Sequence, residues 1–512
     1  MNNDTTNNKT IAKNTIYLYI RMLLMMGVSL YTSRIVLINL GVENYGIYQA
    51  VGGIVGFLDM VNGFMVNGVM RFLTFEMGRG DNIKLHRTFC TAMYIQIGVA
   101  ITIILLAESI GLWFLYNKLV IPDSRLYAAF FVLQFSIITA VFNITQVPYT
   151  SIITSREKMG VFAGITIFDS LAKLVIVLVL PLVTFIDSLI LYGFLLMVVS
   201  LISMSITRIY CIRHFEESKF KLIFDKDIFK QIASYSLWNV ISTFGTVFSG
   251  QGMVILTNMF FSPAIVAARS ISLTVSGQAT RFVQSFRQAI NPQIVKSFAA
   301  GDIERSHNLL LTSTKFSFYL VLLISLPLYL LINPVLNLWL KEVPDYTLLF
   351  AKVVLIENLF STIVSCFYTA IYAKGRLKEF VLTSSMTKIL MFPVVYILFK
   401  LGYDPIVLSW ASLIVNILIA IIIDPIILVK VVGYTYKEIY GVIYKCFTIA
   451  VISLPIPYII YNYTNENTIK GFIIILCSSI SCVLITIFTC GLDKDTRTKV
   501  MHYIKRKIKR NN

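Results

Sequence analysis

Long apolar stretches separated by short polar segments fill most of this chain of 512 residues. Each stretch approaches or exceeds the roughly 20 apolar residues that a helix needs to cross a bilayer. The stretches are too long for membrane β-strands, and they do not alternate apolar with polar residues. The pattern predicts an all-α integral membrane protein with 14 transmembrane helices, at approximately residues 14–40, 45–76, 88–116, 126–153, 161–182, 185–209, 231–260, 264–298, 308–337, 346–373, 380–400, 405–430, 441–462 and 469–490.

The composition favours the same interpretation. Hydrophobic residues make up 57% of the chain and charged residues 14%, whereas a soluble domain carries about 25% charged residues. The net charge of +18 would first suggest a nucleic-acid partner. The basic residues, however, lie in short loops between apolar stretches and in the C-terminal tail, so we expect membrane lipids and no nucleic acid as partners.

The basic residues also predict orientation, because cytoplasmic loops are enriched in Lys and Arg. When the N-terminus, every second loop and the tail are assigned to the cytoplasm, 29 of the 44 Lys and Arg residues lie in or beside those segments, and 5 lie in the opposite loops. This asymmetry predicts that both termini are cytoplasmic. The basic run at 505–510 then serves as an orientation signal and contacts anionic lipids.

One short motif occurs twice and predicts an internal repeat. Gly-Asp, followed after four residues by His, begins at Gly80 and again at Gly301. Six predicted spans separate the copies, which places both on the same membrane side. We expect two parallel six-helix lobes, residues 1–221 and 222–435, followed at 436–512 by two additional transmembrane helices and a basic cytoplasmic tail. In each copy Gly eases the turn and Asp caps the next helix; the histidines are not expected to be catalytic or to bind metal.

Charged residues inside the predicted spans indicate a water-filled cavity, because a charge at the bilayer centre costs about 2.5–3.5 kcal/mol on insertion scales. After the basic residues that can snorkel at span ends or pair along a helix are set aside, four arginines remain: Arg21 and Arg34 in the first span, and Arg269 and Arg281 in the eighth. Guanidinium groups can hold a phosphate through two parallel hydrogen bonds. The cavity is therefore expected to take a substrate that carries phosphate or carboxylate, and neutral sugars also suit its amides and aromatic rings. Lys173, by contrast, is four residues from Asp169 and is expected to pair with it along the helix.

The eighth span adds a polar stripe, since its polar residues recur every three or four positions. The stripe consists of Gly277, Arg281, Gln284, Gln288 and Asn291. The alternative is ordinary interhelical hydrogen bonding, which polar residues provide in any membrane bundle. The candidate substrate-binding residues are Arg21, Arg34, Asn67, Arg71, Asn239, Arg269, Arg281, Gln284 and Gln288.

An acidic residue within a span is a candidate for coupling transport to a proton or sodium gradient. Asp59 is the first choice, and Glu108, Glu357 and Asp424 compete with it. The seven cysteines show no CxxC pair or metal-ligand spacing, and no GxxxxGK[ST] motif for a nucleotide phosphate occurs. We expect no metal, no cofactor and no enzymatic activity.

The N-terminal region resembles a known family. The stretch from Asn14 to Phe57, which includes Ser33–Arg34, Leu40–Gly41 and the Tyr-Gly-Ile-Tyr segment at 45–48, is similar to the first helix and second-helix entry of Wzx-type polysaccharide flippases. These proteins belong to the MATE-like MOP superfamily, and the resemblance extends in architecture over the whole chain. In related lipid II flippases, arginines of the first and eighth helices face the anionic headgroup. The resemblance therefore implies such a role for Arg21 or Arg34 and for Arg269 or Arg281.

The resemblance also implies a function. Such a flippase moves an oligosaccharide linked to undecaprenyl pyrophosphate across the bacterial inner membrane by alternating access, for O-antigen, capsule or exopolysaccharide assembly. A glycan polymerase and chain-length proteins would be its partners. Two alternatives stay open: a cation-coupled drug or metabolite exporter of the same superfamily, and a membrane glycan polymerase or ligase. An exporter of cations favours an acidic cavity, and a polymerase usually needs a large outward loop.

Overall fold

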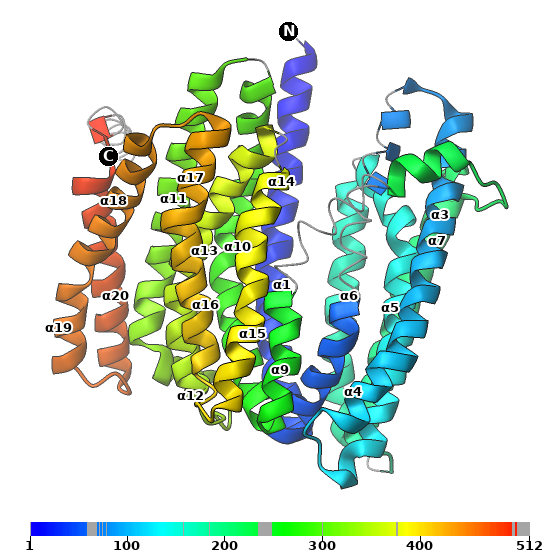
Figure 1. Ribbon diagram of the computed structural model, residues 1–512, viewed down its shortest axis with the longest axis horizontal. Coiled ribbons are helices and arrows are strands. Elements are labelled where there is room, and N and C mark those ends of the chain that lie inside the picture. Colours follow the sequence, from blue (N-terminus) through cyan, green and yellow to red (C-terminus); the bar gives the residue numbers. More distant parts are fainter. Residues whose placement is uncertain are drawn as a thin grey trace, which may run out of the picture. The chain divides into compact units, whose positions relative to one another are not determined.

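The computed structural model describes residues 2–58, 69–70, 72–73, 75–77, 79–156, 158–183, 185–233, 248–299, 301–374, 377–493 and 497–498. Within these residues the chain is helical and contains no β-strand (Figure 1). The described chain divides into two compact units. The all-α membrane fold predicted from the apolar pattern is therefore confirmed for this part of the chain.

Unit 1 comprises Met1–Ser270, Trp339–Asp345 and Ser385–Leu408. Its helices are α1 (Asn2–Leu58), α3 (Asn82–Leu106), α4 (Leu112–Asn117), α5 (Asp123–Ser155), α6 (Met159–Val179), α7 (Ser188–His214), α9 (Met253–Phe260), the start of α10 (Pro263–Ala299) and α15 (Met386–Lys400). Short π-helical turns occur at η1 (Ala107–Gly111) and η4 (Phe248–Gly252), and 3₁₀ turns at η2 (Leu180–Leu182) and η3 (Glu216–Ser218).

Unit 2 comprises Ile271–Leu338, Tyr346–Ser384 and Ser409–Asn512. It holds the rest of α10, α11 (Ile303–Leu330), α12 (Ile332–Trp339), α13 (Thr347–Lys374), α14 (Leu377–Phe380), α16 (Val407–Leu418), α17 (Asp424–Ile427), α18 (Tyr436–Ser453), α19 (Pro455–Tyr463) and α20 (Ile469–Thr486). Its π-helical turns are η5 (Val381–Ser385), η6 (Ile419–Ile423), η7 (Leu428–Val432) and η8 (Ile487–Gly491).

Among the described residues, 11 helical stretches are long and apolar enough to cross a membrane. They are Leu24–Gly56, Asn82–Asn117, Asp123–Ser155, Gly160–Leu182, Ser188–His214, Ile303–Leu330, Thr347–Lys374, Lys378–Lys400, Val407–Val432, Tyr436–Tyr463 and Ile469–Gly491. They coincide with predicted spans of the same regions, with ends that shift by several residues.

The predicted count of 14 stays a prediction, and the difference has three sources. The first predicted span and the start of the second form α1, in which two helical segments meet at Gly41 through non-helical dihedral angles (φ 78°, ψ 166°). Such a positive φ is readily adopted only by glycine. The second predicted span continues beyond Leu58 into residues outside the described part. The seventh predicted span, 231–260, falls partly outside the described residues. The eighth is α10, a helix of 37 residues whose polar stripe keeps it out of the apolar set.

Helix α5 lies at the centre of the packing in unit 1. This helix packs against α7 and α3, and the three lie side by side in the cyan to blue part of Figure 1. Its buried face, for example Ala129, Val132 and Leu133, joins Ile47 of α1 in one apolar core. Close approach of backbones also matters: a Cβ on Gly46 would lie 1.9 Å from the Pro263 carbonyl oxygen, so only glycine fits where α1 meets the start of α10.

The packing of unit 2 is built on α11, which contacts α13, α18 and α20. Its core includes Phe318 and Phe367, both fully buried, together with Cys446 of α18. Large apolar side chains also cover the outside of both units, among them Leu390, Val451 and Ile485, each more than 60% exposed. A soluble protein rarely exposes so many, so this surface is suited to lipid.

The repeated Gly-Asp motif forms two equivalent helix starts. Gly80 and Gly301 adopt φ values of 74° and 81°. The Asp81 carboxylate accepts the backbone N–H of Lys84 at the start of α3, and Asp302 accepts that of Arg305 at the start of α11. The predicted roles of Gly in the turn and Asp in the cap are confirmed. The predicted lobe boundaries at 221/222 and 435/436 stay a prediction.

Candidate functional site

The polar stripe of α10 lies opposite the buried face of the same helix. Because α10 is helical from Pro263 to Ala299, the stripe from Gly277 to Asn291 spans an arc of about 80° at 3.6 residues per turn. Val275, Ala279 and Val283, each 3–6% exposed, lie on the other side. Gln284 is exposed and Arg281 is half-buried. Lipid against this stripe would be costly, so the geometry favours water or a polar ligand.

The described part of the chain places three of the four candidate arginines. Arg34 lies on α1 and is half-buried, and Arg269 lies on the first half of α10 and is 7% exposed; both belong to unit 1. Arg281 belongs to unit 2. All three interact with other residues.

The other candidates are only partly described. Arg21 and Gln288 lie on α1 and α10, but their side chains are outside the described part. Asp59, Asn67, Arg71 and Asn239 lie outside the described residues altogether. Their assignment to a substrate or ion site therefore rests on the sequence.

Hydrogen bonds fix the rotation of α10 within unit 2. The Arg287 guanidinium donates to the carbonyl of Ser365 and, at 3.4 Å, to the Thr369 hydroxyl, both on α13. Three turns towards the N-terminus, the Ser276 hydroxyl donates to the Asn358 side chain at 2.8 Å. These bonds hold one flank of α10 against α13, about 90° around the helix from the centre of the stripe. Arg287 is thus a packing residue.

Three acidic side chains that compete with Asp59 are hydrogen-bonded within their units. Glu108, in η1, accepts the Gln134 amide at 3.2 Å. Glu357 of α13 accepts the Ser412 hydroxyl at 2.7 Å and the Asn416 amide at 3.0 Å, both from α16. Asp424 is fully buried and accepts the Ser384 hydroxyl at 2.6 Å. The geometry thus links each acid to a neighbouring helix.

Unit 1 contains a polar network. Asp169 and Lys173 of α6 form the predicted ion pair at 2.7 Å, which confirms that interpretation, and the Ser203 hydroxyl of α7 donates to the same Asp169 carboxylate. Further along α7, Arg208 donates to the Thr145 hydroxyl of α5 at 2.7 Å. Sequence reasoning placed Arg208 near a span end and missed this role. Arg208 is one residue from the end of the predicted span 185–209, and nothing in the sequence near it signalled this bond.

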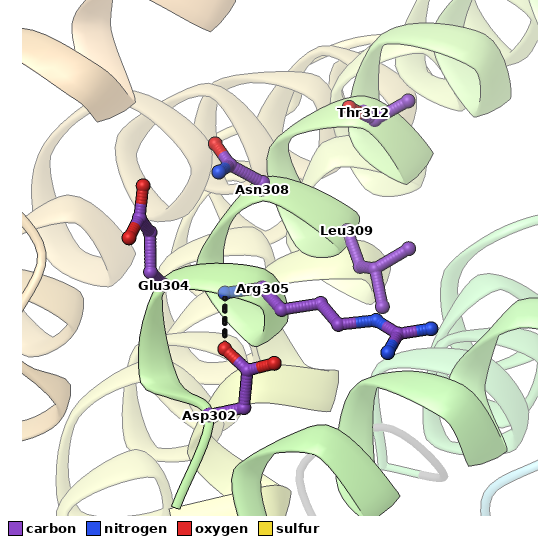
Figure 2. A pocket seen from close by; sticks show the side chains of 6 residues that line it. All are labelled: Asp302, Glu304, Arg305, Asn308, Leu309 and Thr312. Carbon is purple, nitrogen blue, oxygen red and sulfur yellow. Dashed lines mark hydrogen bonds between the residues drawn. The ribbon is translucent and has the colours of Figure 1, made fainter.

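Two of the depressions on the described part of the chain bear on the site. One, of about 420 Å³, lies at the start of α11 in unit 2. Figure 2 shows its six lining side chains, with the Asp302 carboxylate bonded to the Arg305 N–H; it is the solvent-facing side of the helix cap. The other, of about 180 Å³, lies in unit 1 and is called the α5 pocket below. It is lined by Tyr48, Gly52, Val55, Gly56, Ser136, Thr139, Ala140, Asn143, Gly193 and Leu196.

The described residues contain neither a disulfide nor a cluster of side chains that could bind a metal ion. All seven cysteines are unpaired thiols, and four of them are buried: Cys90, Cys211, Cys366 and Cys446. Among the described residues no three His, Cys, Asp or Glu side chains come together as metal ligands. Buried thiols such as Cys90 and Cys446 lie in apolar cores, where cysteine behaves as a small hydrophobic residue.

Long apolar helices, an apolar outer surface and one long helix with a polar stripe are the features of an integral membrane protein. The same fold occurs in membrane flippases and multidrug transporters of known structure. The lipid II flippase MurJ, in an inward closed conformation, matches with a TM-score of 0.68 and 14% identity over 93% of this chain and 98% of that chain. At this identity the likeness shows the fold alone.

Two multidrug transporters match over a similar range. An inward-facing MATE family transporter of the MOP superfamily has a TM-score of 0.65 and 11% identity, covering 84% of this chain and 95% of its own. The MATE multidrug transporter DinF-BH, in a ligand complex, has a TM-score of 0.59 and 15% identity, covering 85% and 96%. No family model matches this chain, and no curated protein matches it by sequence.

Proposed function

We propose that this protein is a flippase that moves an oligosaccharide linked to undecaprenyl pyrophosphate across the bacterial inner membrane. Both termini would lie in the cytoplasm, and the glycan would enter O-antigen, capsule or exopolysaccharide assembly. A glycan polymerase and chain-length proteins would act next. The observation that carries the proposal is the cationic polar stripe of α10, which lies opposite the buried face of its helix, in a fold shared with a lipid II flippase.

The chemistry of the stripe suits the proposed cargo. Arg281 offers a planar fork of donors to a diphosphate, and Gln284 and Gln288 offer amides to sugar hydroxyls. The prenyl chain would stay in lipid, so that only the polar headgroup needs a wet path. Alternating access would carry the headgroup across without exposing it to hydrocarbon. Asp59 remains the first candidate for coupling to an ion gradient, with Glu108, Glu357 and Asp424 as alternatives.

The test is substitution of Arg281. Hydrogen bonds to charged groups are worth about 1.5–3 kcal/mol, so Arg281→Ala should weaken binding of undecaprenyl pyrophosphate in lipid nanodiscs by roughly tenfold to 150-fold. Arg281→Glu should abolish it, and both variants should stop surface-glycan assembly in a flippase-deficient host. Membrane abundance, measured by immunoblot, should stay at the wild-type level.

The matched control is Lys352→Gln. This lysine lies on α13 of the same unit and outside the stripe of α10, with its ammonium 5.6 Å from the centre of the Tyr329 ring of α11. Binding and assembly should survive its loss. Normal carrier binding by Arg281→Glu would refute the cationic site.

The second candidate function is export of drugs or metabolites, which the likeness to multidrug MATE structures favours. Efflux of a cationic dye from whole cells separates the two. An exporter should lower dye accumulation, and Arg281→Ala should leave that efflux intact or improve it, because the arginine repels cations. A flippase should leave dye accumulation at the level of cells without the protein.

A further inference from the structure

The α5 pocket lies at mid-depth in unit 1. Helix α5 has 33 residues and is therefore about 50 Å long, against a hydrocarbon core of about 30 Å. Thr139 is the midpoint of α5, and Ser136 and Asn143 lie within four residues of it. The polar side of the pocket thus lies near the middle of a predicted span, where contact with lipid is costly for a polar group and water or a polar ligand is the more favourable neighbour.

Three helices form the pocket, and small residues open it. Ser136, Thr139 and Asn143 share one face of α5, while α1 contributes Tyr48 and Gly52 four residues apart. A Cβ added to Gly52 would meet no atom within 4 Å, so this glycine faces open space. Gly193 of α7 completes the wall and is close-packed instead, because its Cβ would contact Phe135 and Val132 at 3.4 Å.

The lining selects for an uncharged, hydroxyl-rich ligand. None of the described lining residues is charged, so neither a diphosphate nor a cationic drug finds a counter-charge. The Ser136 hydroxyl and the Asn143 amide can donate and accept hydrogen bonds. The Thr139 hydroxyl donates to the Phe135 carbonyl at 2.8 Å and still accepts. Tyr48, placed edge-on to Tyr192 with ring centres 5.0 Å apart, adds an aromatic surface.

The volume sets the size of the ligand. The 180 Å³ of the pocket equals about six water molecules at about 30 Å³ each. It is below the roughly 300–1,000 Å³ typical of pockets for drug-sized molecules. The pocket thus has room for about one sugar ring, and the other rings of a longer glycan would extend out of it.

We propose that the α5 pocket binds one neutral sugar ring of the lipid-linked glycan. This inference rests on the proposed function and deepens it, because it assigns sugar selection to unit 1. The Asn143 amide and the hydroxyls of α5 form hydrogen bonds with the hydroxyls of the sugar ring. The apolar face of the ring packs against the side of the pocket formed by Gly52 and Tyr48.

Equilibrium binding to purified protein in nanodiscs tests the proposal. The probes are undecaprenyl pyrophosphate alone and the same carrier bearing one glucose, one galactose or one N-acetylglucosamine. Wild-type protein should bind at least one sugar-bearing carrier tenfold or more tightly than the bare carrier. Gly52→Leu, which fills the pocket, and Asn143→Leu, which removes the amide, should each erase that gain and leave binding of the bare carrier unchanged.

The matched control is Gly98→Leu on α3, where an added Cβ also meets no atom within 4 Å but the pocket is elsewhere. It should keep the full sugar-dependent gain. If no sugar strengthens binding to the wild type, or if the gain survives both pocket variants, the pocket is a hydrated void and the proposal is wrong. Failure of the bare carrier to bind would instead reject the proposed function, which separates the two results.

Discussion

Asp493 shows how a single charge secures the end of the last helix. Its carboxylate lies 3.5 Å from the Lys315 ammonium of α11 and 3.5 Å from that of Lys445 in α18. The positive charge of Lys315, followed by that of Lys445, lowers the pKa of Asp493 below its usual range. Nearby, the Tyr319 hydroxyl contacts the Gly491 carbonyl at 3.5 Å. The chain leaving η8 is therefore attached to two other helices.

The lowered pKa predicts a pH-dependent stability. A carboxyl whose folded pKa lies below its unfolded value stabilises the fold above the unfolded pKa of about 3.9, and this contribution is lost as pH falls through the folded value. The Asp493 side chain is 63% exposed, so water screens the pairs and the effect is small, about 0.2–1 kcal/mol. Asp493→Asn should lower the melting temperature in detergent slightly at pH 7, by about 2 °C or less, and the difference should shrink towards zero as the pH is lowered to about 3 and below.

The control for this measurement is Glu216→Gln. Glu216 is 96% exposed and 3.7 Å from Lys219, so its loss should change melting at neither pH. An Asp493→Asn protein that melts like wild type at pH 7, or that shows the same difference at both pH values, would contradict the ion-pair account.

At the residue scale, local patterns were predictable and distant partners were not. The pairing of Asp169 with Lys173 followed from a spacing of four residues on a helix. The contacts of Arg208 with Thr145, or of Glu357 with Ser412, join residues 63 and 55 positions apart. Only the packing of helices brings such residues together, and no spacing within a helix signals it.

At the scale of the helix, the two Asp caps give a direct prediction. Loss of a helix N-cap costs about 0.5–2 kcal/mol, because one backbone N–H of the first turn loses its acceptor. Asp302→Ala should therefore speed hydrogen exchange in the first two turns of α11, and Asp302→Asn should restore protection, since asparagine caps equally well. Mass-spectrometric hydrogen exchange on residues 303–310 measures both.

The second copy serves as the comparison. Asp81→Ala should affect the start of α3 and leave α11 unchanged, because each cap acts only on its own helix. If Asp302→Asn loosens α11 as much as Asp302→Ala does, the carboxylate has another role than the cap.

Some helix ends and interruptions could be predicted from the sequence, and others could not. The Gly-Asp motif predicted both caps because the chemistry of a cap is local. The interruption of α1 at Gly41 fell between two predicted spans, so the break was predicted, although a loop was expected there. The π-helical turns were missed, since η6 consists of Ile and Ala residues only and no residue in it signals the change.

At the scale of the whole molecule, orientation is the untested prediction with the simplest measurement. Asn462, at the end of α19, is exposed and is predicted to face the outside. A membrane-impermeant thiol reagent should label Asn462→Cys in intact cells, in a background in which all seven native cysteines are replaced. Cys477 and Cys490 are exposed and would otherwise react.

A second single-cysteine variant controls the labelling. Glu216, in the segment that follows α7, is exposed and is predicted to be cytoplasmic, so Glu216→Cys should react only after cell lysis. The reverse pattern would invert the predicted topology, and labelling of both in intact cells would reject the span count between them.

The class of molecule could be predicted from the sequence because the surrounding lipid determines it. A chain with so few charges and such long apolar stretches has to form helices in lipid, where every backbone group needs a hydrogen-bond partner within the protein. The substrate-binding residues were harder to predict from the sequence. The stripe of α10 was predicted from its period, and the structure adds that Val275 and Val283 are buried on the opposite face. The α5 pocket was not predicted. Its lining residues come from three helices that are distant in sequence, and its space depends on glycines, which carry no side chain that could indicate a binding site.

The π-helical turns around Asp424 change how this region has to be scanned by mutagenesis. Each such turn adds about one residue relative to an α-helix, which rotates everything beyond it by about 100°. Between Ser412 and Val432 the chain passes through η6 and η7, so positions that share a side before Ile419 diverge after Ile423. A cysteine or alanine scan analysed with one constant period would assign lipid-facing and protein-facing positions wrongly beyond that point.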